Sequence, residues 1–153
     1  MSTTTRIDLS PFFEAIEDIE DKNAGGCLMF CYVFYLWLKK NGHPLDSFTI
    51  TQIGWKDTIE HNMAFLEGRR ATAMSSSHFV WDYEGVRYDG EGLYLGGYSY
   101  CDKAPLPLFE DSIENFCLSA LNNANWNPTF NRNRAIDIVQ ERLGLDLSLI
   151  KRF

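Results

Sequence analysis

The chain has 153 residues, of which 45% are hydrophobic and 14% aromatic, and its formal net charge is −7. A chain of this length and composition buries roughly two-thirds of its unfolded surface in one domain, so we expect a single domain spanning residues 1–153. Nonspecific nucleic-acid binding depends on clustered Lys and Arg, which an acidic chain lacks. We therefore expect no nucleic-acid partner.

The N-terminal segment and the cysteines indicate the compartment. The sequence MSTTTRIDLSPFF lacks the basic patch and apolar run of a secretory signal, and the longest apolar stretch, at 27–38, is too short to span a bilayer. We expect a cytoplasmic protein with no membrane partner. In that compartment the cysteines are expected to be reduced thiols, although two disulfides are the alternative. The cysteines are Cys27, Cys31, Cys101 and Cys117.

Two helices are predicted in the first third of the chain. Ser10 and Pro11, followed by FFEAIEDIE, provide the cap, first-turn proline and apolar spacing of an amphipathic helix that ends near Asp21. After the break DKNAGG, the segment CLMFCYVFYLWLKKNG is apolar nearly all round. It predicts a buried central helix that begins at Cys27 and stops at Gly42.

Strands and further helices are predicted in the remainder. The alternation of FTITQI favours a strand at 48–53, whereas the stretch that follows, up to Arg70, is ambiguous between helix and loop. The segment HFVWDYEGVRYDGEG predicts a β-hairpin, with strands at 78–81 and 86–88 around the turn at 82–85. LYLGGYSY is compatible with one more strand. Two more helices are predicted, in the segments LFEDSIENFCLSALNN and NRNRAIDIVQERLG. The expected fold class is therefore α+β.

Cys27 is the candidate nucleophile. It follows Gly25 and Gly26 at the first turn of the predicted buried helix, where unpaired backbone N–H groups and the helix dipole favour an anion such as a thiolate. The same N–H groups, reached across Gly26, are suited to the oxyanion of a tetrahedral intermediate. The alternative is that Cys27 is a small buried apolar residue, which is the usual role of a free cysteine.

A metal site is not expected. Cys31 lies one turn deeper in the same helix than Cys27, where no open helix end favours ionisation, so we expect it to pack in the core. The two cysteines have the spacing of half a metal site, but no second Cys or His pair with ligand spacing completes it. We expect no metal and no cofactor.

His78 and Asp89 are the candidate base and its orienting carboxylate. His78 opens the first strand of the predicted hairpin and Asp89 closes the second, so the two side chains should lie within hydrogen-bond reach. A base and the group that orients it need this geometry. The structural alternatives are an edge-strand histidine and, for the Asp89-Gly90 pair, a turn former. His61 is a second candidate base.

The order of these motifs resembles the papain-like superfamily, in particular its NlpC-type, transglutaminase-core and arylamine N-acetyltransferase-like branches. The GGC at 25–27 is similar to the start of the nucleophile helix, HFVW at 78–81 resembles the histidine strand, and YDGEG at 88–92 resembles the end of the next strand. The resemblance implies a papain-like fold, with the cysteine helix packed on a small antiparallel sheet. Papain-like proteases usually carry a glutamine shortly before the cysteine. Here the nearest amide is Asn23, so Asn23 and Gly26 are the candidates for oxyanion or substrate binding.

Residues and resemblance together predict a cysteine-dependent hydrolase of an amide, isopeptide or ester bond, acting on a peptide, protein or small amide. Cys27 attacks the carbonyl, His78 transfers the proton, Asp89 orients His78, and a thioester intermediate is released to water. Release to an amine, as in transglutaminase-type acyl transfer, is an alternative. Acetyl transfer is disfavoured because no coenzyme A site is evident. A further alternative is a noncatalytic, acidic binding or inhibitory protein.

Overall fold

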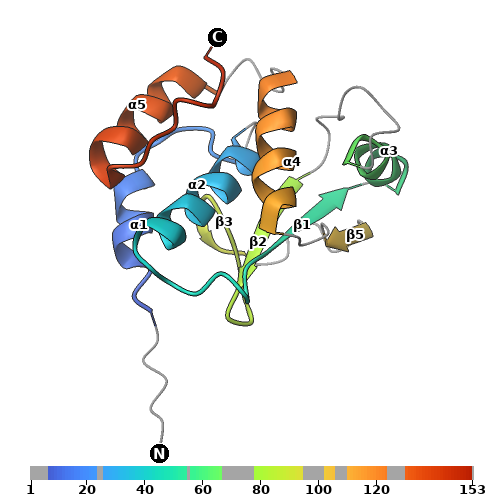
Figure 1. Cartoon of the computed structure of the whole chain (residues 1–153), viewed down its shortest axis with the longest axis horizontal. Helices are drawn as coiled ribbons and strands as arrows, with labels where there is room; N and C mark the ends of the chain where they lie inside the picture. Colours follow the sequence, from blue (N-terminus) through green and yellow to red (C-terminus); the bar gives the residue numbers. More distant parts are fainter. Residues whose placement is uncertain are drawn as a thin grey trace, which may run out of the picture.

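A computed structural model describes residues 7–23, 26–54, 56–66, 78–94, 102–105, 110–123 and 130–152 of the chain. Helices and antiparallel strands are mixed along these residues, as the predicted α+β class requires (Figure 1). The helices are α1 (Ser10–Ile16), α2 (Cys27–Lys40), α3 (Lys56–Leu66), α4 (Glu110–Asn123) and α5 (Arg132–Leu143). The strands are β1 (Thr49–Gly54), β2 (His78–Tyr83), β3 (Val86–Asp89), β4 (Gly92–Leu93) and β5 (Asp102–Pro105).

The strands form one sheet in the order β4-β3-β2-β1-β5, and each neighbouring pair is antiparallel. The predicted hairpin is confirmed as β2 and β3, with Tyr83 paired to Val86. Its turn has two residues rather than four, because Glu84 (φ 50°) and Gly85 (φ 79°) both adopt positive φ. Such a turn matches the right-handed twist of the strands that it joins, so it holds the two strands in register.

The helix α2 is the buried central helix that the sequence predicts. Its residues from Cys27 to Tyr35 are all buried, and it packs against β2 and α4. The Phe34 ring stacks on Trp81 of β2, with ring centroids 5.0 Å apart, and the Phe12 ring of α1 meets Phe34 edge-on at 5.0 Å. Because α2 is covered on its different sides by helices and sheet, its first turn is held in a fixed place beside β2.

The helix α1 ends at Ile16, five residues before the predicted end near Asp21. Asp21 adopts a left-handed conformation (φ 59°), which turns the chain back along the helix. The Lys22 ammonium then donates hydrogen bonds to the carbonyls of Glu17 (3.1 Å) and Ile19 (2.9 Å). These contacts satisfy carbonyl groups that a longer helix would have used, so the predicted end was wrong for a specific reason.

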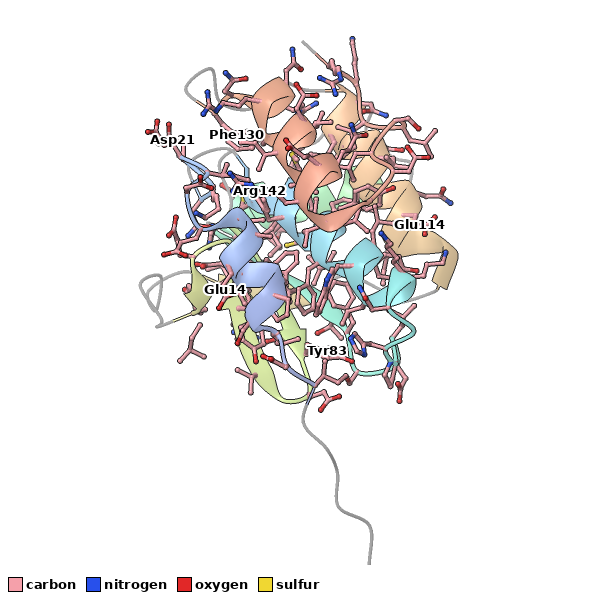
Figure 2. The ribbon with its side chains drawn as sticks, turned by 90° about the vertical axis from the view of Figure 1, so that its left-hand side faces the viewer. Glu14, Asp21, Tyr83, Glu114, Phe130 and Arg142 are labelled. Carbon is pink, nitrogen blue, oxygen red and sulfur yellow. The ribbon has the colours of Figure 1, made fainter. Side chains whose placement is uncertain are left out.

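The last helix, α5, lies beside α1 (Figure 2). Asn131 caps it by accepting a hydrogen bond from the N–H of Arg134 at 3.1 Å. Arg142 in its last turn forms an ion pair with Asp18, which follows α1. This ion pair links the last turn of α5 to the segment that follows α1.

The ambiguous stretch before Arg70 forms α3 as far as Leu66, beside β1 and β5 and apart from the other helices in Figure 1. Of the possible strand in LYLGGYSY, the first residue belongs to β4 and the part beyond Tyr94 lies outside the described residues. None of the described helices combines the length and the apolar character needed to cross a membrane.

Candidate active site

Cys27 is the first residue of α2, and its side chain is almost buried. Gly26 is the N-cap residue, and its carbonyl accepts the first helical hydrogen bond, from the N–H of Phe30 at 3.1 Å. No side chain of the described residues caps this end of the helix. The N–H groups of the first turn, beside the sulfur, have no acceptor within the helix, so they provide donors for an anion.

Gly26 is required by the packing around it. A Cβ at this position would lie 2.8 Å from the carbonyl oxygen of Lys22 and 2.8 Å from two ring carbons of Phe130. Contacts that short are not tolerated by backbone or a buried ring, so the chain before Cys27 passes through a space that only glycine fits. Gly25, the other glycine of the motif, lies outside the described residues.

His78 and Asp89 lie side by side, as predicted from the hairpin. His78 Nε2 is 3.4 Å from Asp89 Oδ2, at the long end of the hydrogen-bond range, and both side chains are nearly buried. The other carboxylate oxygen, Oδ1, accepts a hydrogen bond from the N–H of Glu91 at 2.9 Å. The turn-forming role and the pairing with histidine are therefore both present, because each uses a different oxygen of Asp89.

Cys27 is the second side chain, beside Asp89, that raises the pKa of His78. Burial lowers the pKa of His78, but the hydrogen bonds to Asp89 and Cys27 and the charges of both partners raise it by more, from 6.5 to about 9. The imidazole is therefore a cation near neutral pH. With Nε2 directed at Asp89, Nδ1 is the ring nitrogen left for the Cys27 thiol.

Asp89 is the carboxylate committed to the histidine. Burial raises its pKa, but hydrogen bonds from His78, from the N–H of Glu91 and from the Asn23 side chain lower it by more, so the net shift is downward. The other carboxylate of the hairpin, Asp82, is occupied elsewhere. It pairs with Arg87 at 2.8 Å and accepts hydrogen bonds from two threonine hydroxyls of β1.

Two contacts of the site had not been predicted. The Asn23 side chain lies against Gly90 in the turn after Asp89 and lowers the pKa of that carboxylate, whereas its expected role at the oxyanion stays a prediction. The Tyr94 ring lies beside the His78 ring, with centroids 6.1 Å apart. Neither residue has a sequence signal beyond its closeness to the motifs, because both contacts join segments that are distant in sequence.

The remaining thiols lie away from this arrangement. Cys31 and Cys117 are free and fully buried, and burial raises the pKa of each thiol. The prediction that Cys31 packs in the core is confirmed, while Cys101 falls outside the described residues. His61 lies on α3, and the histidine that contacts Cys27 is His78. Within the described parts of the chain, no group of three metal-ligating side chains occurs.

Three elements thus bring together a thiol, a cationic imidazole and an ionised carboxylate. In such a line of groups the ring can hold the proton of the thiol and leave a nucleophilic sulfur at the helix end. No protein-family model, curated protein or solved structure matches the chain. The arrangement is therefore interpreted from its own geometry.

Proposed function

We propose that this chain is a cysteine-dependent hydrolase of papain-like type, which cleaves an amide, isopeptide or ester bond. The observation that carries the proposal is the position of His78, whose Nε2 lies 3.4 Å from Asp89 Oδ2 and whose pKa is raised by both Asp89 and Cys27. A cysteine that only filled the core would not need a cationic, carboxylate-oriented histidine as its neighbour.

The motif order supports the papain-like assignment. The GC pair at 26–27 begins a buried helix, and that helix packs on an antiparallel sheet whose strands carry His78 and Asp89. This arrangement agrees with what the resemblance implies for the nucleophile, histidine and aspartate. The likeness is one of motifs and topology, so the proposal depends on the chemistry of the site.

The proposed reaction has two halves. In the first, His78 holds the proton of the Cys27 thiol as an imidazolium and the thiolate Sγ bonds to the substrate carbonyl carbon, while the carbonyl electron pair moves to its oxygen, beside the N–H groups of the first turn of α2. The bond to the leaving group then breaks, and His78 gives the proton to the departing nitrogen or oxygen. In the second half, water attacks the thioester, His78 takes a water proton, and the C–S bond breaks to restore Cys27.

Thiol alkylation with peptide mapping tests the site before any substrate is known. Iodoacetamide near pH 7 should label Cys27 at least about tenfold faster than Cys31 and Cys117, because an ordinary thiol is only a few per cent ionised at that pH and the other two are buried with raised pKa values. His78→Ala should remove most of this advantage, since the thiolate loses its counter-ion.

The matched control lies in the same hairpin. Asp89→Asn should slow the alkylation of Cys27, whereas Asp82→Asn, which removes a carboxylate paired with Arg87, should leave it unchanged. If Cys27 reacts no faster than the other thiols, or if His78→Ala reacts at the parental rate, the proposal is wrong. Hydroxylamine added to active substrate reactions traps the thioester as a hydroxamate, so it tests for the covalent intermediate that hydrolysis and transfer share.

A further inference from the structure

We propose that Lys22 is a positioning residue, which holds the segment before Cys27 against the turn that follows Asp89. The inference rests on the function proposed above and concerns how its nucleophile and its orienting carboxylate are kept in place relative to each other. Lys22 lies between α1 and α2, and its side chain is only 3% exposed. Lysine is among the residues least often buried, so a buried lysine shortly before the nucleophile calls for a physical reason.

The Lys22 ammonium is bound by main-chain groups of its own segment. Nζ donates hydrogen bonds to the carbonyls of Glu17 (3.1 Å) and Ile19 (2.9 Å), which lie just beyond the end of α1. The Glu91 carboxylate is 3.8 Å from Nζ, but its side chain is 62% exposed, so this ion pair contributes little. The two carbonyls therefore fix the ammonium, and the side chain is held close to the turn that follows α1.

Two glycines show that Lys22 contacts both sides of the site. A Cβ on Gly90 would lie 3.0 Å from Lys22 Cβ and 3.6 Å from Lys22 Cδ, so the stem of the side chain packs on the turn after Asp89. A Cβ on Gly26 would lie 2.8 Å from the Lys22 carbonyl oxygen, so the main chain of Lys22 packs on the residue before Cys27. A lysine that only capped the end of α1 would need neither contact.

The turn that Lys22 contacts is joined directly to the orienting carboxylate. The N–H of Glu91 donates to Asp89 Oδ1 at 2.9 Å, and Asp89 Oδ2 lies 3.4 Å from His78 Nε2. A displacement of Gly90 would move the Glu91 N–H that fixes Oδ1, and with it the direction in which Oδ2 faces His78. The contact of Lys22 with Gly90 therefore acts on the base through Asp89.

The charged groups around Lys22 favour a cation at this place. A pocket of about 200 Å³ lies here, lined by Phe13, Glu14, Glu17, Lys22, Gly90 and Glu91. Lys22 is the one cation of this lining, beside three carboxylates. Without its ammonium the carboxylates would repel one another, and the carbonyls of Glu17 and Ile19 would lose their donor. We therefore expect the turn after α1 to move away from Gly90 when the ammonium is removed.

The pH dependence of the site involves the groups that face His78 in the described part of the chain. These are Asp89 of β3, the Cys27 thiol of α2 and Tyr94, whose ring centroid is 6.1 Å from that of His78. Lys22 would act on them by keeping Asp89 and Cys27 in place.

The test compares Lys22→Met with Lys40→Met. Methionine keeps an unbranched side chain but removes the ammonium. Lys40 also donates to two carbonyls at a helix end, those of Leu143 (3.1 Å) and Gly144 (2.7 Å), but it lies at the end of α2 opposite Cys27. Each variant thus loses two hydrogen bonds to the main chain. Only Lys22→Met should slow the alkylation of Cys27 by iodoacetamide at pH 7, by about three- to tenfold, which is less than the roughly hundredfold that a misplacement of about 1 Å can cost.

The pH profile separates positioning from a loss of structure. The deficit of Lys22→Met should disappear near pH 10, because an ordinary thiol is mostly ionised there without help from a histidine. Cys31 and Cys117, which are fully buried, should react as slowly at pH 7 as in the parent. The inference is overturned if the deficit persists at pH 10, or if Lys22→Met with both core thiols protected reacts at the parental rate at pH 7.

Gly90→Val provides a second perturbation, which keeps the ammonium. Its Cβ would lie 3.0 Å from Lys22 Cβ and carries two further methyl groups, so the turn after Asp89 has to move away from Lys22. Alkylation of Cys27 should then slow at pH 7 and recover near pH 10. Gly85→Ala strains the turn at the other end of the hairpin, where its Cβ meets open space, and should keep the parental rate. If Lys22→Met does not fold, a parental profile in Gly90→Val overturns the inference.

The same measurements distinguish this inference from the proposed function. If His78→Ala slows alkylation but Lys22→Met and Gly90→Val keep the parental profile, the proposed function stands and the role of Lys22 does not. If Cys27 is not rapidly alkylated in the parent, both are wrong.

Discussion

The titration of His78 can be separated into its causes by removing its partners one at a time. Burial lowers the pKa of His78, and Asp89 and Cys27 raise it to about 9. Each of Asp89→Asn and Cys27→Ala should therefore lower the pKa from about 9. The double variant removes both of these partners, so its pKa should be lower than that of either single variant.

The size of the effect follows from the same values. The difference between 6.5 and about 9 corresponds to on the order of 3 kcal/mol that favours the imidazolium over the neutral ring. Asp89 and Cys27 each raise the pKa both through a hydrogen bond and through charge, so each single variant should remove part of this difference.

Long-range proton–nitrogen correlation spectra of the imidazole rings measure both the pKa and the tautomer. The chain has three histidines, so His43 and His61 are internal references in every sample. We expect the neutral ring of His78 to carry its proton on Nε2, facing Asp89. The reasoning is refuted if His78 of the parent titrates near 6.5, or if Asp89→Asn leaves its titration unchanged.

Three further substitutions separate stability from reactivity. Cys31→Ala should cost about 1–2 kcal/mol in the free energy of unfolding, because it removes a fully buried sulfur, yet Cys27 should be alkylated as in the parent. Urea titration measures the first effect, and lost alkylation at full stability would contradict the assignment. Gly26→Ala should cost about 1–3 kcal/mol and slow alkylation, because its Cβ overlaps neighbours at 2.8 Å. Gly42→Ala, with φ 69° and open space around it, should cost about 1 kcal/mol through backbone strain alone. Equal alkylation rates in the two glycine variants would show that the space at Gly26 does not position the sulfur.

The sequence predicted those features that depend on local pattern. The segment 27–38 has no polar face, so a helix formed from it must be covered on all sides, and α2 is. The closeness of His78 and Asp89 followed from antiparallel pairing, in which a short turn fixes the register of both strands. Both predictions needed only residues near each other along the chain.

Other features depend on contacts that no local pattern encodes. Apolar spacing continues through Ile19 and suggested a helix up to Asp21, but Ile19 is buried in a turn whose carbonyl binds the Lys22 ammonium. Apolar spacing indicates which side chains are buried, and a side chain can be buried in a turn as well as in a helix. The packing of Asn23 against Gly90 depends on how the chain leaves α1, whereas the sequence alone shows only that an amide lies near Cys27.

Asp89 shows why a structural and a catalytic interpretation of one residue need not compete. A carboxylate that accepts the N–H of Glu91 through Oδ1 has its plane fixed by that turn, and Oδ2 is then directed at His78 without further adjustment. The end of the hairpin therefore positions the Asp89 carboxylate beside His78. Asp89→Asn can keep an oxygen for the Glu91 N–H while it removes the charge, so any loss of reactivity reports on charge and tautomer. Asp89→Ala would remove the turn contact as well, and its loss of reactivity would combine an open hairpin end with a missing counter-ion.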